Sequence, residues 1–174
     1  MKKYIKGFMY TAFLIGISVL GFLFFTVSYS DSDDESDTET VVESYQNPNE
    51  NMIISALDND FEMIQSLIAN GADPNFQNNE DGITALHYAA AHDNVRMIQF
   101  LLDNGANIDI ASYNGETPLY SALDQNAERA VELLLQRGAD PFLENNNGEN
   151  CFQKATHNKR MNAILSQYNQ KRKG

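Results

Sequence analysis

The sequence predicts an all-α protein, a solenoid of about four stacked helix-turn-helix units preceded by an N-terminal transmembrane helix. Glycines recur every 33 residues at Gly82, Gly115 and Gly148, and again at Gly105 and Gly138. Apolar residues between these glycines fall at helical spacing, and a long uncharged run precedes them. A fixed period of this length is typical of solenoids, in which each unit buries its apolar side against the next one.

The N-terminal run spans residues 7–30 and contains 24 consecutive uncharged residues. As a helix it would extend about 36 Å, which exceeds the roughly 30 Å of a bilayer core. Three lysines within residues 1–6 precede it and acidic residues follow, so we expect a cytoplasmic N-terminus and an outward-facing remainder. The MKKYIK start is typical of bacteria, which would place the repeats in the periplasm, anchored to the inner membrane by a single pass.

A cleaved signal peptide is the alternative interpretation of the same run. Ser28 and Ser30 could occupy the small positions before a cut at Asp31. The apolar run is longer than the roughly 7–15 residues of a signal-peptide core, which favours a retained anchor. Cleavage would instead give an exported soluble protein.

Residues 31–48 are predicted to form a disordered linker. They hold seven acidic and no basic residues, and few apolar ones. Such a segment cannot bury enough apolar surface to offset the entropy of ordering it. A flexible coil of this length would reach roughly 20–25 Å, which would hold the repeats just clear of the lipid headgroups.

The repeat domain is predicted to cover residues 49–174, with units at 49–81, 82–114, 115–147 and 148–174. In the second unit, Thr84 is placed to cap a short Ala-rich helix and Asn94 to begin a second helix. This second helix carries an apolar stripe of Met97, Ile98, Leu101 and Leu102. Gly105 follows, where a left-handed residue ends a helix without a Cβ penalty, and Gly71 and Gly138 share its column.

Two positions raise questions about the regularity of the repeats. The third unit places Glu128 in the column of Phe61 and Val95, where we expect local loosening or a charged side chain that reaches for solvent. The last unit aligns Ile164 with Val131, and it departs from the pattern by placing Gln167 in the column of Leu101 and Leu134.

Two kinds of motif recur in the units. TALH (84–87) and TPLY (117–120) begin the first helices, and GADPN (71–75), GANID (105–109) and GADPF (138–142) follow the second helices. In these motifs the chain resembles ankyrin-repeat proteins, over residues 49–174. The resemblance implies a protein-interaction scaffold in which the TPLH-type motif, here including Thr117 and Pro118, starts the first helix of each unit.

The resemblance also implies a structural role for His87. In the family, the His of this motif bonds to the Thr three residues before it, here Thr84, and to neighbouring backbone, which ties adjacent units together. Tyr120, Gln153 and Ile53 fill the same column in the other units. A role that such different side chains can fill is packing. We therefore interpret His87 as a structural link between units and not as a catalytic residue.

The sequence predicts no enzyme, no cofactor and no metal site. His87 and His92 are five residues apart, whereas two ligands on one helix face need a spacing of three or four. Cys151 is the sole cysteine, and we interpret it as a partly buried thiol in the last unit. No Gly-rich phosphate loop or G-x-S-x-G motif is present in the sequence.

Charge separates the body of the repeats from their C-terminal end. Residues 49–147 contain sixteen acidic residues against three arginines, whereas residues 148–174 contain six basic residues and one acidic residue. An acidic body repels nucleic acid and anionic lipid and steers basic surfaces towards itself. We therefore expect a protein partner with a basic surface and no nucleic acid, although the charge could equally serve solubility.

Ankyrin domains generally bind proteins through hairpin tips and the exposed side of each first helix, and the resemblance implies the same here. We call the corresponding residues the concave face: Glu80, Ile83, Tyr88, His92, Tyr113, Glu116, Ser121, Asp124, Gln125 and Glu149. Tyr88 and Tyr113 are candidate aromatic anchors. The sequence thus predicts a monomeric, membrane-tethered interaction module, or alternatively a secreted inhibitor or effector of another protein.

Overall fold

The computed structural model describes residues 47–173, and within this range it contains helices and no strand. The elements are α2 (Pro48–Leu57), α3 (Phe61–Ala69), α4 (Ala85–Ala91), α5 (Val95–Asp103), α6 (Pro118–Asp124), α7 (Glu128–Gln136), α8 (Cys151–Lys154), the 3-10 helix η1 (Ala155–His157) and α9 (Lys159–Lys173). The predicted span of 7–30 and nearly all of the predicted linker lie outside the described residues. None of the described helices is both long and apolar enough to cross a bilayer.

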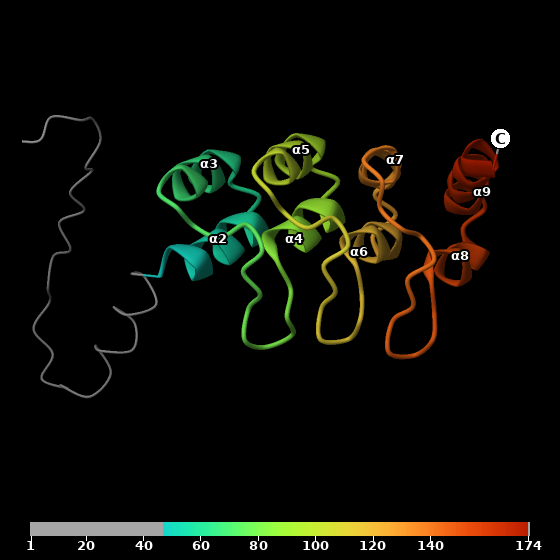
Figure 1. The fold of residues 1–174 in the computed structure, drawn as a ribbon, viewed down its shortest axis with the longest axis horizontal. Helices are drawn as coiled ribbons and strands as arrows, with labels where there is room; N and C mark the ends of the chain where they lie inside the picture. Colours follow the sequence, from blue (N-terminus) through green and yellow to red (C-terminus); the bar gives the residue numbers. More distant parts are fainter. Residues whose placement is uncertain (1–46, 174) are drawn as a thin grey trace, which may run out of the picture. The chain divides into compact units, whose positions relative to one another are not determined.

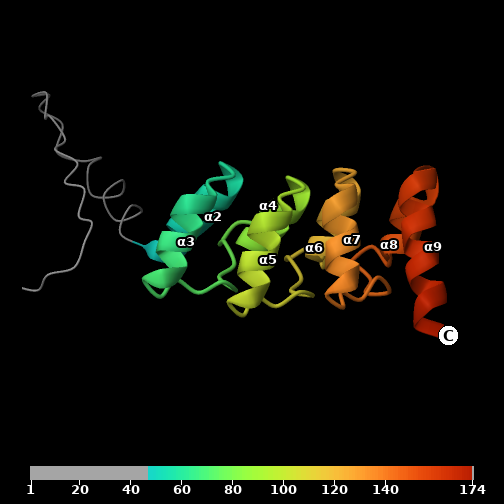
Figure 2. The ribbon, with the colours of Figure 1, turned by 90° about the horizontal axis from the view of Figure 1, so that it is seen from above.

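The helices form two rows, as a stack of helical pairs requires. The first helices α2, α4, α6 and α8 lie in one row, and α3, α5, α7 and α9 lie in the other (Figure 1). Neighbours within each row contact one another, α4 touching both α2 and α6, and α7 touching both α5 and α9. Figure 2 shows the second row from above, with its helices side by side. The predicted all-α solenoid is confirmed.

Small and branched apolar residues fill the space between the rows. Ala89 and Ala122 are fully buried in equivalent positions, where their size lets neighbouring first helices approach closely. Leu86 and Leu119 are fully buried three residues earlier in each unit. Burial of each leucine contributes about 1.5–3 kcal/mol of transfer free energy, so the core grows by a similar increment with each unit.

Long hairpins join successive units and stack by backbone hydrogen bonds. The Tyr113 N–H donates to the Asp81 carbonyl at 2.8 Å, and the Asn146 N–H donates to the Asn114 carbonyl at 2.9 Å. Gly115 adopts φ +78°, and a Cβ there would lie 2.9 Å from the Asn146 nitrogen. The turn glycine therefore leaves room for the next hairpin.

The last unit departs from the 33-residue period. Asn158 caps α9 by accepting from the N–H groups of Arg160 and Met161 at 3.0 and 3.2 Å, two residues earlier than the period would place the cap. Met161 and Leu165 consequently enter the core, with 1% and 0% of their surface exposed, and Ile164 is only partly buried. The earlier cap shifts which residues of α9 face the core, so that Leu165 is buried and Gln167, which the period aligns with Leu134, is exposed.

The third unit shows no loosening around Glu128. The N-cap residue of α7 is Ala127, whose side chain offers no acceptor. Asp93 of the preceding unit supplies the missing acceptor, since its Oδ1 accepts from the Ala130 N–H at 2.7 Å. The Glu128 carboxylate reaches outward and pairs with Arg160 of the following unit. Contacts between units thus supply the helix start that the local sequence lacks.

Candidate protein-interaction face

The concave face is built from equivalent positions in successive units. Six of its ten predicted residues line one hollow of about 240 Å³: Ile83, Tyr88, Glu116, Ser121, Asp124 and Gln125. His87 and Ala91 complete the lining, so the hollow lies between α4 and α6. Residues that are 33 positions apart in sequence therefore meet in one place, because adjacent first helices are in contact.

The other four predicted residues lie outside this hollow. Glu80 and Tyr113 are exposed in the hairpins, and His92 is exposed at the C-terminal end of α4. Glu149 is exposed just before α8, where its Oε2 accepts a hydrogen bond from the Tyr120 hydroxyl at 3.1 Å.

His87 lies under the hollow as a link between two units. Its Nδ1 lies 2.9 Å from the Thr84 Oγ1 and accepts from the Thr84 N–H at 3.2 Å, and its Nε2 lies 3.0 Å from the Glu116 carbonyl oxygen. Because a carbonyl only accepts, Nε2 carries a proton. Because Nδ1 accepts from the Thr84 N–H, it carries none, and the ring is neutral. Burial lowers the pKa of His87, against the raising effect of the bond to Glu116.

Tyr120 makes the equivalent link one unit later. Its hydroxyl bonds to Glu149, which occupies the column of Glu116, so the two side chains cross to equivalent positions of the next unit. Burial is the main cause that raises the pKa of the Tyr120 hydroxyl, and the bond to Glu149 adds to it. A neutral imidazole and a neutral phenol in equivalent positions therefore both link adjacent units.

One lysine lies among the carboxylates at the C-terminal end of the face. Lys154 of α8 pairs with Asp124 of α6, and its Nζ lies 5.0 Å from the centre of the Tyr120 ring. The hydrogen bond to Asp124 is the main cause that raises the pKa of Lys154, and burial opposes it. This end of the face therefore holds one cation among the carboxylates of Glu116, Asp124 and Glu149.

Sequence reasoning missed two apolar residues at the opposite end. Ile54 and Leu57 of α2 are 50% and 51% exposed. They precede Tyr88 and Ala91 by 34 residues, so they belong to the same columns and extend the concave face onto the first unit. The column alignment contained the signal that could have found them.

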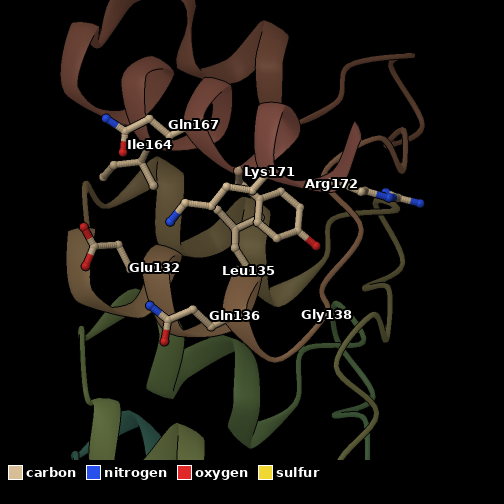
Figure 3. Close-up of a pocket in the computed structure, with 9 residues that line it drawn as sticks. Glu132, Leu135, Gln136, Gly138, Ile164, Gln167, Lys171 and Arg172 are labelled. Atoms are coloured by element: carbon tan, nitrogen blue, oxygen red, sulfur yellow. The ribbon is translucent and has the colours of Figure 1, made fainter. Parts of the chain in front are cut away.

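A second groove lies between α7 and α9, away from the concave face. It has a volume of about 590 Å³ and a mixed lining of polar, charged and apolar side chains. Figure 3 shows the Lys171 side chain extending across it towards the α7 side, where Glu132 and Gln136 lie. None of the ten predicted residues lines this groove.

Reactive groups are few in the part of the chain that the structure describes. Across residues 47–173 no three His, Cys, Asp or Glu side chains gather as metal ligands would. Cys151 is buried more deeply than predicted, at 1% exposure, and burial raises the pKa of its thiol to about 12. The thiol is therefore protonated at neutral pH and is a poor nucleophile.

The family model for ankyrin repeats, in three copies, matches residues 52–145, which is more than half of the chain. The chain belongs to the ankyrin-repeat family. Ankyrin repeats are protein-interaction modules, generally without catalytic activity. The stacked helical pairs and the buried link that His87 makes between two units are consistent with that role.

Several proteins share short segments with this chain. The E3 ubiquitin-protein ligase KEG of Arabidopsis thaliana is 42% identical over 59 residues, which cover 34% of this chain and 4% of that protein. The RelA-associated inhibitor of Mus musculus is 36% identical over 74 residues, covering 42% and 9%. Ankyrin repeat domain-containing protein 40 of Mus musculus is 35% identical over 60 residues, covering 34% and 16%. The chain thus spans only a small part of each relative.

Proposed function

We propose that this ankyrin stack binds a partner protein through its concave face and that the partner presents a basic surface. The observation that carries the proposal is the hollow between α4 and α6, which gathers six of the ten predicted residues around Glu116 and Asp124. Shape and charge support the same place, because a hollow admits a protruding side chain and carboxylates favour a cation.

The surrounding charge favours a basic partner at longer range as well. Sixteen acidic residues face three arginines over residues 49–147. Such a field raises the association rate of oppositely charged surfaces and falls with added salt. Tyr88 at the hollow and Tyr113 on the neighbouring hairpin supply aromatic surface, a residue type enriched among interface anchors.

We further propose that residues 7–30 hold the module on the outer side of a bacterial inner membrane. The length of the uncharged run and the lysines before it support a single-pass anchor with a cytoplasmic N-terminus. The alternative is a cleaved, exported protein that acts as an inhibitor or effector of another protein. Sequencing the mature N-terminus separates the two, since Asp31 as the first residue means cleavage and Met1 means retention.

Capture of the partner from the native envelope tests the binding proposal. We expect Tyr88→Ala/Tyr113→Ala in the full chain to reduce the captured partner at least tenfold, because two aromatic anchors together contribute more than 2 kcal/mol to a typical interface. The matched control is Glu132→Ala/Gln136→Ala, on exposed positions of α7 in the other row. Circular dichroism checks that both variants stay folded. Equal capture by the wild type and the tyrosine variant would contradict the proposed face.

A further inference from the structure

The concave face changes character along its length. At the first unit, Ile54 and Leu57 leave half of their surface exposed on α2, and no acidic residue occupies their columns in that unit or the next. At the third and fourth units the same columns hold Ser121 and Asp124, then Lys154 and His157. The face therefore has an apolar end and an ionic end.

The ionic end already holds a cation from the same chain, the side-chain amine of Lys154. The Lys154 ammonium pairs with Asp124 and lies over the Tyr120 ring, whose hydroxyl bonds to Glu149. An amine between carboxylates and an aromatic face is a favourable arrangement for a cation. Lys154 thus shows what kind of group these side chains accept.

The pair between Lys154 and Asp124 is open to exchange. The two side chains keep 29% and 47% of their surface exposed, and an ion pair at that exposure contributes little to stability. Asp124 also lines the hollow between α4 and α6 together with Glu116. Within residues 47–173, Glu116 forms no ion pair. A cation entering the hollow would therefore meet Glu116 directly and Asp124 after Lys154 moves aside.

We propose that the occupant of the concave face is an extended segment of the partner that carries apolar side chains at one end and an arginine or lysine at the other. The apolar side chains lie on Ile54 and Leu57, and the basic one enters the hollow and displaces Lys154 from Asp124. This proposal rests on the proposed function and adds the chemistry of the partner segment to it.

The stack sets the distance between the two ends of that segment. Helices α2, α4 and α6 contact one another in order, and packed helices are about 8–10 Å apart, so α2 and α6 are separated by roughly 16–20 Å. An extended chain rises about 3.3 Å per residue and covers that distance in about five or six residues. The basic residue should therefore lie about five or six positions from the apolar ones.

Selection from a random library of displayed ten-residue peptides tests this occupant. The immobilised full chain is used as wild type, Lys154→Gln, Asp124→Asn and Lys171→Gln, and fluorescence anisotropy gives the Kd of each enriched peptide. We expect peptides with a basic residue about five or six positions from apolar ones. Lys154→Gln should tighten binding about threefold or more and Asp124→Asn should weaken it about tenfold. Lys171→Gln removes the same charge from α9 and should change little.

Three results would overturn the proposal. One is enrichment of peptides without a basic residue, another is an equal effect of Lys154→Gln and Lys171→Gln, and the third is the absence of any enriched peptide. The proposed function has its own test, because capture that depends on Tyr88 and Tyr113 would still assign binding to this face. Retained capture with a failed selection therefore rejects the occupant alone.

Discussion

At the scale of single residues, His87 shows how burial decides what a reactive side chain does. The imidazole is 1% exposed and both of its nitrogens are committed, Nδ1 to Thr84 and Nε2 to the Glu116 carbonyl. A second proton would have to enter on Nδ1, which would end its bond with the Thr84 N–H. The ring is therefore held neutral, and folding should respond to pH through it.

We expect the stability of the wild type to fall below pH 6.5 through His87. Because burial lowers the pKa in the folded chain from its ordinary value of 6.5, the unfolded chain binds the proton first. The stabilising effect is complete above pH 6.5 and is lost as pH falls towards the folded pKa, at about 1.4 kcal/mol per pH unit.

The measurement is the free energy of urea unfolding between pH 8 and pH 5 for the wild type and His87→Gln. Glutamine fills the same column in the last unit at Gln153 and does not titrate, so the difference between the two chains isolates His87 from the carboxylates. Parallel pH profiles would show that His87 is not held neutral in the folded chain.

At the scale of helices, each unit depends on groups that its neighbours supply. Helix α7 begins at a residue without a capping side chain, and Asp93, at φ +53° in the preceding unit, provides the acceptor. Asn59 and Asn126 occupy the same left-handed position and bond to the Asn94 and Asn158 side chains of the units that follow them. This column therefore links all four units along the second helices.

Asp93→Gly should lower the unfolding free energy by about 1 kcal/mol, the usual contribution of a helix cap. Glycine tolerates the left-handed backbone, so the loss reports the missing acceptor and not strain. Asp93→Asn keeps both an acceptor and a residue suited to positive φ, and it should cost less. Urea unfolding of the two variants measures the difference, and equal losses would contradict the assignment of Asp93 as the cap of α7.

Much of this arrangement could be predicted because the repeats place equivalent residues at a fixed interval. The helix starts at Thr84 and Asn94 follow from local motifs, and the family resemblance implies the pairing of His87 with Thr84. The cap from Asp93 to Ala130 could not be found in this way, since it joins residues in different columns. The start of α9 could not be predicted from the period either, because Asn158 caps this helix two residues before the position that the period gives.

At the scale of the described repeat stack, the concave face follows one row of helices. The concave face begins with exposed apolar side chains at Ile54 and Leu57, continues through Tyr88, and ends among Glu116, Asp124 and Lys154. The second row also carries ion pairs between units, among them Arg137 with Asp103. The proposed binding contacts thus lie along the first row of helices, and exposed positions of the second row provide controls.

Site-specific photo-crosslinking in intact cells tests the proposed binding face most directly. The full chain carries p-benzoylphenylalanine in place of Tyr88 on the concave face, or in place of Glu132 on exposed α7, and adducts are identified by mass spectrometry after irradiation. Binding through the concave face predicts a partner adduct from position 88, with the crosslinked peptide containing a basic residue, and no such adduct from position 132. An adduct of equal yield from both positions, or from position 132 alone, would contradict it.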